Sequence, residues 1–151
     1  RVEWRGYIFN ESFWQITFSI MKYTAQYSQL VMPDHINNVG TLFGGQMVSW
    51  MDLAAAKVAY RFLRDTDAVG AVTRAIEKVE FKEPVFAGEW INFSSKVINV
   101  GESSISIQVD AFAESKLRKK RLACTATITM VAVKKKSDEN FIKFTHGNQV
   151  D

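Results

Sequence analysis

The sequence predicts an α+β domain in which a curved antiparallel sheet of about five or six strands wraps around one long buried helix. A single apolar helical run covers residues 43–62, and four strand-like runs follow it with short turns between them. The 151 residues suffice for one domain with a sizeable core. The alternatives are a helix-on-sheet sandwich and a ferredoxin-like fold, although the latter requires a second long helix that the pattern does not provide.

Composition narrows the classes of function. The net charge of +3 fits an anionic small ligand but is too small to argue for nucleic acid. A single cysteine, Cys124, and two histidines, His35 and His146, leave no zinc cluster and no intrachain disulfide. There is no run of eighteen apolar residues and no evident secretory signal. We therefore expect a cytoplasmic protein without metal, nucleic acid or membrane partners.

Residues 1–22 are expected to form an aromatic N-terminal extension of unknown role. The segment is too aromatic for disorder, and Met21 is a candidate natural start. Apolar and polar residues alternate over 14–20, which is the period of a strand. We expect this segment to pack on its own domain or on a neighbouring subunit. Its aromatic residues are Trp4, Tyr7, Phe9, Phe13, Trp14 and Phe18.

The main domain is expected over residues 23–135 and begins with a strand-like run, 23–32. A turn-rich stretch, 33–40, precedes the helix. The helical run 43–62 contains three consecutive alanines and no proline. Since apolar residues occupy almost every face of this run, we expect a helix buried on all sides.

Four runs after the helix have strand character and are expected to form successive antiparallel hairpins. The last is the clearest, because alternate residues are apolar while threonines occupy the other face. The tail, 136–151, is polar with a small apolar island, and we expect a short docking segment or a loose end. The four runs are 72–81, 89–100, 103–113 and 122–133, and the apolar face of the last comprises Leu122, Cys124, Ala126, Ile128, Met130 and Ala132.

Asp52 is the residue that does not suit a core. It lies mid-helix, and its neighbours three and four positions away are small or apolar, so its carboxylate cannot pair along its own helix. Burying an unpaired carboxylate is costly. Either a partner reaches it from elsewhere, or its helix face lines a cleft where it would suit a general base. A purely structural bond to a loop or a neighbouring chain is the alternative.

The start of the helix offers further polar groups. Gly44 and Gly45 allow close approach to the backbone, and the first N–H groups of a helix are unpaired and partly positive. Such groups can donate to a carbonyl oxygen as it becomes an oxyanion. Taken alone, the glycines favour the simpler interpretation that they permit tight packing of the helix start. Asn37 can donate and accept, although an asparagine in a turn often serves its own backbone.

Residues Met32 to Asp52 (MPDHINNVGTLFGGQMVSWMD) resemble the signature of the hotdog-fold acyl-CoA thioesterases of the short hexameric bacterial type. That family also contains two-domain brain and liver enzymes. The runs Val79 to Ser104 and TATITMVAVKK are similar to the family too, so the resemblance covers about 23–135. The matching signature positions are Asn37, Gly40, Leu42, Phe43, Gly44, Gly45 and Asp52.

The resemblance implies a hotdog fold and hydrolysis of acyl-CoA thioesters to fatty acid and coenzyme A. Asp52 would be the general base that activates water, with a nucleophilic role as the minor alternative. Asn37 would position the water or the thioester, and the amides of Gly44 and Gly45 would polarise the carbonyl. The family builds each site at a dimer interface, with Asn and Asp from opposite subunits. The resemblance thus implies a dimer, within a trimer of dimers, and no cofactor beyond coenzyme A in the substrate.

Substrate contacts are also implied. We assign Gly40 and Phe43 of the signature to the substrate, and Thr73 and Arg74 lie where the family's second strand runs beside the pantetheine arm. Ser103 and Ser104 follow a turn in which Glu102 replaces a family arginine. Other cations are therefore candidates for the coenzyme A phosphates, and we select Lys119 and Arg121 from the basic run 116–121. A solvated turn whose lysines discourage edge pairing is the alternative.

Three other functions are weighed. One is a module that binds acyl-CoA without turnover, which would gain nothing from a buried base. Another is hydrolysis of acyl carrier protein thioesters, which the charge does not distinguish. The last is a hotdog dehydratase, which would need a histidine that this helix lacks.

Overall fold

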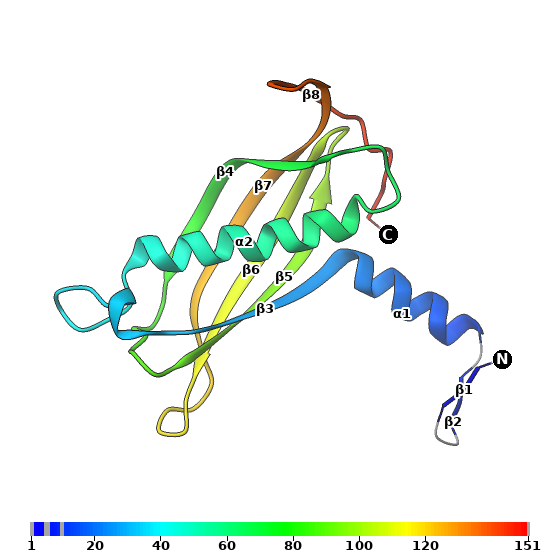
Figure 1. Ribbon diagram of the computed structural model, residues 1–151. Coiled ribbons are helices and arrows are strands. Elements are labelled where there is room, and N and C mark those ends of the chain that lie inside the picture. The colour runs from blue at the N-terminus through cyan, green and yellow to red at the C-terminus, as the bar shows by residue number, and fades with distance from the viewer. Residues whose placement is uncertain (1, 5–6, 10, 151) are drawn as a thin grey trace.

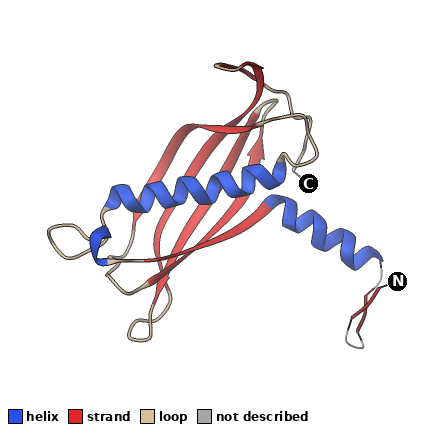
Figure 2. Cartoon of the chain, in the orientation of Figure 1, coloured by secondary structure: helices blue, strands red, loops and turns tan. Residues whose placement is uncertain are grey.

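The computed structural model describes residues 2–4, 7–9 and 11–150. Two short strands and a helix come first in the chain, and long strands follow the central helix (Figure 2). In chain order the elements are β1 (Val2–Trp4), β2 (Tyr7–Phe9), α1 (Glu11–Tyr23), β3 (Thr24–Leu30), the 3-10 helix η1 (Pro33–His35), α2 (Gly44–Phe62), β4 (Gly70–Phe81), β5 (Trp90–Val100), β6 (Ser104–Glu114), β7 (Arg121–Ser137) and β8 (Asn140–Lys143).

The main sheet has the order β3-β5-β6-β7-β4, with every neighbouring pair antiparallel, and it curves around α2 (Figure 1). This confirms the predicted α+β class with a curved sheet wrapped around one long helix. The expectation of successive hairpins holds for β5, β6 and β7 only. It is wrong for β4, which pairs with β7, whereas β5 lies between β3 and β6. The connection 82–89 crosses to the other side of the sheet and is held by the bonds Leu42 N–H to Val85 O and Val31 N–H to Glu89 O.

One face of α2 packs on the concave face of the sheet. Small residues such as Ala54, Ala55 and Ala59 are fully buried there and let the helix lie close to the strands. The prediction that the helix is buried on all sides is wrong for this chain. Leu53 is 52% exposed and Tyr60 is 69% exposed, on the side of α2 that points away from the sheet.

Strand β7 confirms most of its predicted apolar face. Cys124, Ile128 and Ala132 are fully buried, and burial raises the pKa of the Cys124 thiol to about 11. Leu122 is the exception, because a register shift in the pairing of β6 with β7 makes Ala123 the extra residue. The bulge turns Leu122 to the opposite face, where it pairs with Phe112.

The two edges of the sheet differ. At the β3 edge, the Arg61 guanidinium donates to Thr24 O at 2.9 Å and the Lys57 ammonium donates to Gln26 O. These side chains occupy carbonyls that another strand would need. At the other edge, β4 pairs only with β7 among the described residues, and Val72 of β4 is exposed. Pairing with a further strand is therefore less hindered at β4 than at β3.

The N-terminal segment departs from expectation. Residues 14–20, predicted as a strand, belong to helix α1. Their apolar spacing also places Ile16 and Ile20 one helical turn apart, and the helical period prevails. The end of α1 packs on α2, with the Tyr23 and Phe62 ring centroids 5.8 Å apart. The predicted packing of the aromatic side chains of residues 1–20 lies outside the described residues. Of the helices described, none has the length and apolarity to cross a bilayer.

The C-terminal tail is docked rather than loose. Strand β8 pairs with the end of β7, and the Asn148 side chain donates to Phe62 O at 2.7 Å. His146 is buried with its ring edge-on to Phe62, at a centroid distance of 5.5 Å. The tail therefore covers the carboxyl end of α2.

A nearly buried ion pair fixes the end of the sheet near the start of α2. Glu89 is 2% exposed, and both of its carboxylate oxygens accept from Arg121 at 2.8 Å. Arg121 also donates to Pro84 O, and Phe86 N–H donates to Glu89. Burial acts to raise the pKa of Glu89, but the bonds from Arg121 and Phe86 outweigh it and hold this pKa below its ordinary value. The pair joins the 82–89 connection to the start of β7.

Replacing Glu89 by glutamine should lower the free energy of unfolding by about 3 kcal/mol, because it leaves the Arg121 guanidinium without its carboxylate. Chemical denaturation at pH 7 measures this. A matched control is Glu80→Gln, which removes an exposed carboxylate that pairs with Lys82. The control should change stability little.

The same comparison has an expected pH dependence. A lowered carboxyl pKa stabilises the fold fully above the pKa of the unfolded chain, and the effect is lost as pH falls through the folded value. The difference between the parent and Glu89→Gln should thus shrink below pH 4.5, the ordinary value. Equal effects of Glu89→Gln and Glu80→Gln at pH 7 would contradict this account of the pair.

Candidate active site

Asp52 lies midway along α2 and is partly exposed. Its carboxylate has a partner from another element, as one of the two expectations required: the Thr73 hydroxyl of β4 donates to Asp52 Oδ1 at 2.6 Å. The second carboxylate oxygen accepts no hydrogen bond from the residues that the structure describes. A neutral donor therefore holds the carboxylate and leaves one oxygen open to a water molecule.

The amino end of α2 is uncapped. Its N-cap residue, Phe43, provides no side-chain bond, and the amides of Gln46 and Met47 donate to Phe43 O. Within the described ranges, the amides of Gly44 and Gly45 have no acceptor. Two donors at the positive end of a helix dipole are thus available to a ligand oxygen.

The glycines also have a packing role. A Cβ on Gly45 would lie 2.5 Å from the Phe43 ring, and one on Gly44 would lie 3.3 Å from the Phe81 ring. Both rings rest against the first turn of α2, which supports the packing interpretation of these glycines. The packing role and the free amides are compatible, because the rings lie where a Cβ would project and do not accept from the amides.

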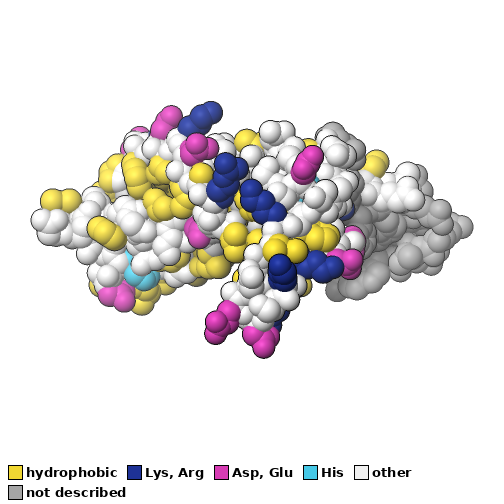
Figure 3. Space-filling view, turned by 90° about the horizontal axis from the view of Figure 1, so that it is seen from above, with side chains coloured by type: hydrophobic (Ala, Val, Ile, Leu, Met, Phe, Trp, Pro, Cys, Tyr) yellow, Lys and Arg dark blue, Asp and Glu magenta, His cyan; other side chains and the backbone are white. Residues whose placement is uncertain are grey.

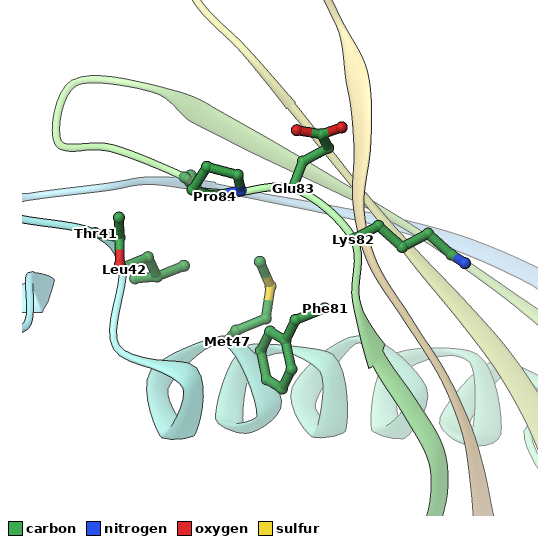
Figure 4. A pocket seen from close by; sticks show the side chains of 8 residues that line it. Thr41, Leu42, Met47, Phe81, Lys82, Glu83 and Pro84 are labelled. Atoms are coloured by element: carbon green, nitrogen blue, oxygen red, sulfur yellow. The ribbon is translucent and has the colours of Figure 1, made fainter.

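A cavity of about 250 Å³ lies beside this first turn, lined mainly by apolar groups. In Figure 4, Met47 of α2 and Phe81 at the end of β4 lie close together, with Leu42 opposite. The Lys82 and Glu83 side chains point away from these three (Figure 4). The cavity therefore suits an uncharged chain rather than a charged group.

Asn37 serves its own loop in this structure. Its side-chain oxygen accepts from the amides of Val39 and Thr41, and its side-chain nitrogen donates to the Thr41 hydroxyl at 3.0 Å. Gly40 has a φ of +87° and so permits the turn. One amide hydrogen of Asn37 is left for a ligand.

The free amides and Asp52 are not brought together within one chain. Asp52 is eight positions after Gly44 in the helix, which corresponds to about 12 Å along the axis. The first N–H groups point out of the amino end of α2, away from Asp52. One carbonyl cannot contact both sets of groups in a single chain.

The other predicted substrate contacts are spread over the molecule. Arg74 is exposed at an irregularity of β4 next to Thr73. Ser103 and Ser104 lie at the start of β6, at the end of the sheet where the tail docks, and His146 Nε2 is 3.3 Å from Ser104 O. Phe43 is exposed at the start of α2, Lys119 is exposed in the β6–β7 turn, and Arg121 is engaged by Glu89.

Sequence reasoning did not single out Thr41, Phe81 or Glu83. Thr41 bonds Asn37, and Phe81 rests on Gly44, so both shape the site. The sequence contains one indication of this loop bond, the threonine four residues after Asn37. The position of Phe81 depends on the pairing of β4 with β7, which no local pattern encodes.

Comparisons with known proteins give a consistent result. Residues 39–119 match the model of the thioesterase superfamily. An uncharacterized acyl-CoA thioester hydrolase of Haemophilus influenzae is 31% identical over 108 residues, covering 69% of this chain and 68% of that protein. Mouse acyl-coenzyme A thioesterase 11 is 31% identical over 108 residues, covering 71% of this chain. The chain spans only 18% of the length of that mouse relative.

Comparison with solved structures also finds thioesterases and acyl-CoA hydrolases. The hexameric thioesterase y2039 of Yersinia pestis is 28% identical with a TM-score of 0.67, covering 72% of this chain and 86% of that one. An acyl-CoA hydrolase from Bacillus cereus is 29% identical with a TM-score of 0.69, covering 79% of this chain and 71% of that one.

Two substitutions separate the loop role of Asn37 from its donor role. Asn37→Ala leaves the amides of Val39 and Thr41 without their acceptor and should lower the free energy of unfolding by about 1 kcal/mol. Asn37→Asp keeps that acceptor, and the Thr41 hydroxyl can donate to the new carboxylate in place of the lost amide donor, so this variant should retain parental stability. Chemical denaturation of both variants measures the difference, and equal stability of the two would contradict the loop role.

Proposed function

Because the chain belongs to the thioesterase superfamily and has the hotdog fold, we propose that it hydrolyses acyl-CoA thioesters to a carboxylic acid and coenzyme A. The observation that carries the proposal is the carboxylate of Asp52, held by Thr73 through one oxygen and open at the other. A binding module would have no use for such a group.

In this mechanism Asp52 acts as a general base. Its open carboxylate oxygen takes a proton from water as the water oxygen attacks the thioester carbonyl carbon. The bond from Thr73 fixes the direction of the carboxylate. The carbonyl oxygen becomes an oxyanion, and collapse of the tetrahedral intermediate breaks the C–S bond. The coenzyme A sulfur leaves with the proton, and the acid is released.

The oxyanion accepts hydrogen bonds from the amides of Gly44 and Gly45 in a second copy of the chain. This follows from the separation of about 12 Å between these groups and Asp52 within one copy. In the two-copy site, the α2 of one subunit presents its amino end to the Asp52 of the other. Asn37, next to that amino end, uses its remaining amide hydrogen to position the water or the thioester.

The surface offers a place for the second copy. The β4 edge is open, and the outer side of α2 carries the exposed Leu53 and Tyr60. Hydrophobic side chains gather among charged ones on the face seen in Figure 3. Antiparallel pairing of two β4 strands would satisfy the open backbone groups and cover the apolar side chains beside them. Association of such pairs into a trimer of dimers would agree with the hexameric relative.

The direct test is thiol release from acyl-CoAs of two to sixteen carbons. Asp52→Asn should lower kcat by about 100-fold or more, because it removes the general base and keeps the shape. Asp65→Asn is the matched control, since Asp65 is exposed just after α2. It should leave turnover unchanged.

Three outcomes would contradict the proposal. Full turnover by Asp52→Asn would remove Asp52 as the base. Saturable acyl-CoA binding by a folded parent that releases no thiol would favour a binding module. Release from acyl carrier protein thioesters, but not from acyl-CoA, would change the substrate class.

A further inference from the structure

A second hollow, of about 360 Å³, lies between the β4–β5 connection and the β6–β7 turn. Both loops are at the same end of the sheet (Figure 1). We call this space the basic hollow. Its lining residues are Glu83, Pro84 and Phe86 from the first loop and Arg118, Lys119, Lys120 and Arg121 from the second.

Three of the four basic side chains that line the basic hollow form no ion pair with a described residue. Arg121 is engaged by Glu89 and Pro84 O. In contrast, Arg118, Lys119 and Lys120 form no ion pair with any residue that the structure describes. Glu83 is the one carboxylate in the lining. The hollow therefore has a positive excess that suits a multiply charged anion.

Two of these cations are held in place without using their donors. The Arg118 guanidinium lies 4.1 Å from the centroid of the Phe86 ring, and the Lys120 ammonium lies 4.9 Å from that of Phe112. Cation–π contact orients a charge but leaves its N–H groups to bond a ligand. The turn itself is fixed by Ser115, whose hydroxyl accepts from the amide of Arg118. Because these side chains are already oriented, they lose little conformational entropy when they bind an anionic ligand.

The basic hollow adjoins the proposed active site. Glu83 and Pro84 also line the 250 Å³ cavity beside the first turn of α2. Beside the free amides of Gly44 and Gly45, a mainly apolar cavity thus adjoins a cationic one. A ligand with a reactive carbonyl, an uncharged arm and terminal phosphates matches this sequence of environments.

We propose that the basic hollow binds the phosphate groups at the nucleotide end of coenzyme A, through Arg118, Lys119 and Lys120. The inference rests on the proposed function, because it assumes that the thioester lies at the start of α2. The hollow then selects coenzyme A thioesters over those that lack the nucleotide. Its cations are specificity residues and take no part in bond breaking.

The test compares the double variant Lys119→Ala/Lys120→Ala with Lys134→Ala/Lys136→Ala, which removes two exposed lysines from the far part of β7. The first variant should raise KM for an acyl-CoA at least about tenfold with kcat unchanged, since each charged hydrogen bond is worth about a factor of ten. Its KM for the same acyl group on pantetheine should not change. The control should match the parent with both substrates.

Calorimetry with adenosine 3′,5′-bisphosphate decides the matter independently of turnover. The parent and the control should bind it, and Lys119→Ala/Lys120→Ala should bind it at least about tenfold more weakly. Equal binding by all three proteins would overturn the proposal, as would an equal rise in KM for the coenzyme A and pantetheine thioesters. Equally tight binding of inorganic phosphate would show a general anion site and overturn the assignment to the nucleotide. If the parent releases no thiol but the three proteins bind the bisphosphate as expected, the proposed function is refuted and the phosphate site is not.

Discussion

The proposed site depends on the distance between two parts of one helix, the amino end of α2 and Asp52. The sheet wraps α2, so its free amides lie at the amino end while Asp52 lies about 12 Å along the axis. In the proposed reaction, a thioester carbonyl must meet both a base and an oxyanion donor, and the proposal assigns these to two copies of the chain. The two edges of the sheet fit this proposal, because Lys57 and Arg61 occupy two carbonyls of the β3 edge, whereas β4 pairs only with β7 among the described residues.

Much of the fold was predictable because its signals are local. The alternation of apolar residues identified β7, and the alanine-rich run identified α2. The errors have physical causes. The pairing of β4 with β7 is a long-range choice, and the bulge at Ala123 inverts Leu122 without any local sign. Helix α1 was mistaken for a strand because its apolar spacing fits both periods over seven residues.

In the candidate site too, local sequence indicates some residues, whereas long-range strand pairing determines the contacts of others. Asp52 stood out since a carboxylate conflicts with apolar helix neighbours, and the glycines stood out as breakers at a helix start. That Thr73 bonds Asp52, or that Arg121 is engaged by Glu89, depends on strands brought together from distant parts of the chain. Residue type alone could not separate Arg121, which holds two loops together, from Lys119, which is exposed in the adjoining hollow.

The most direct test of the two-copy site mixes two variants, Asn37→Ala and Asp52→Ala, each with little activity alone. Refolded together in equal amounts, half of the dimers should be mixed, and each mixed dimer should contain one site with both residues intact. The mixture should therefore recover roughly a quarter of the parental turnover. A mixture no more active than the mean of the two variants would contradict a site built from two copies.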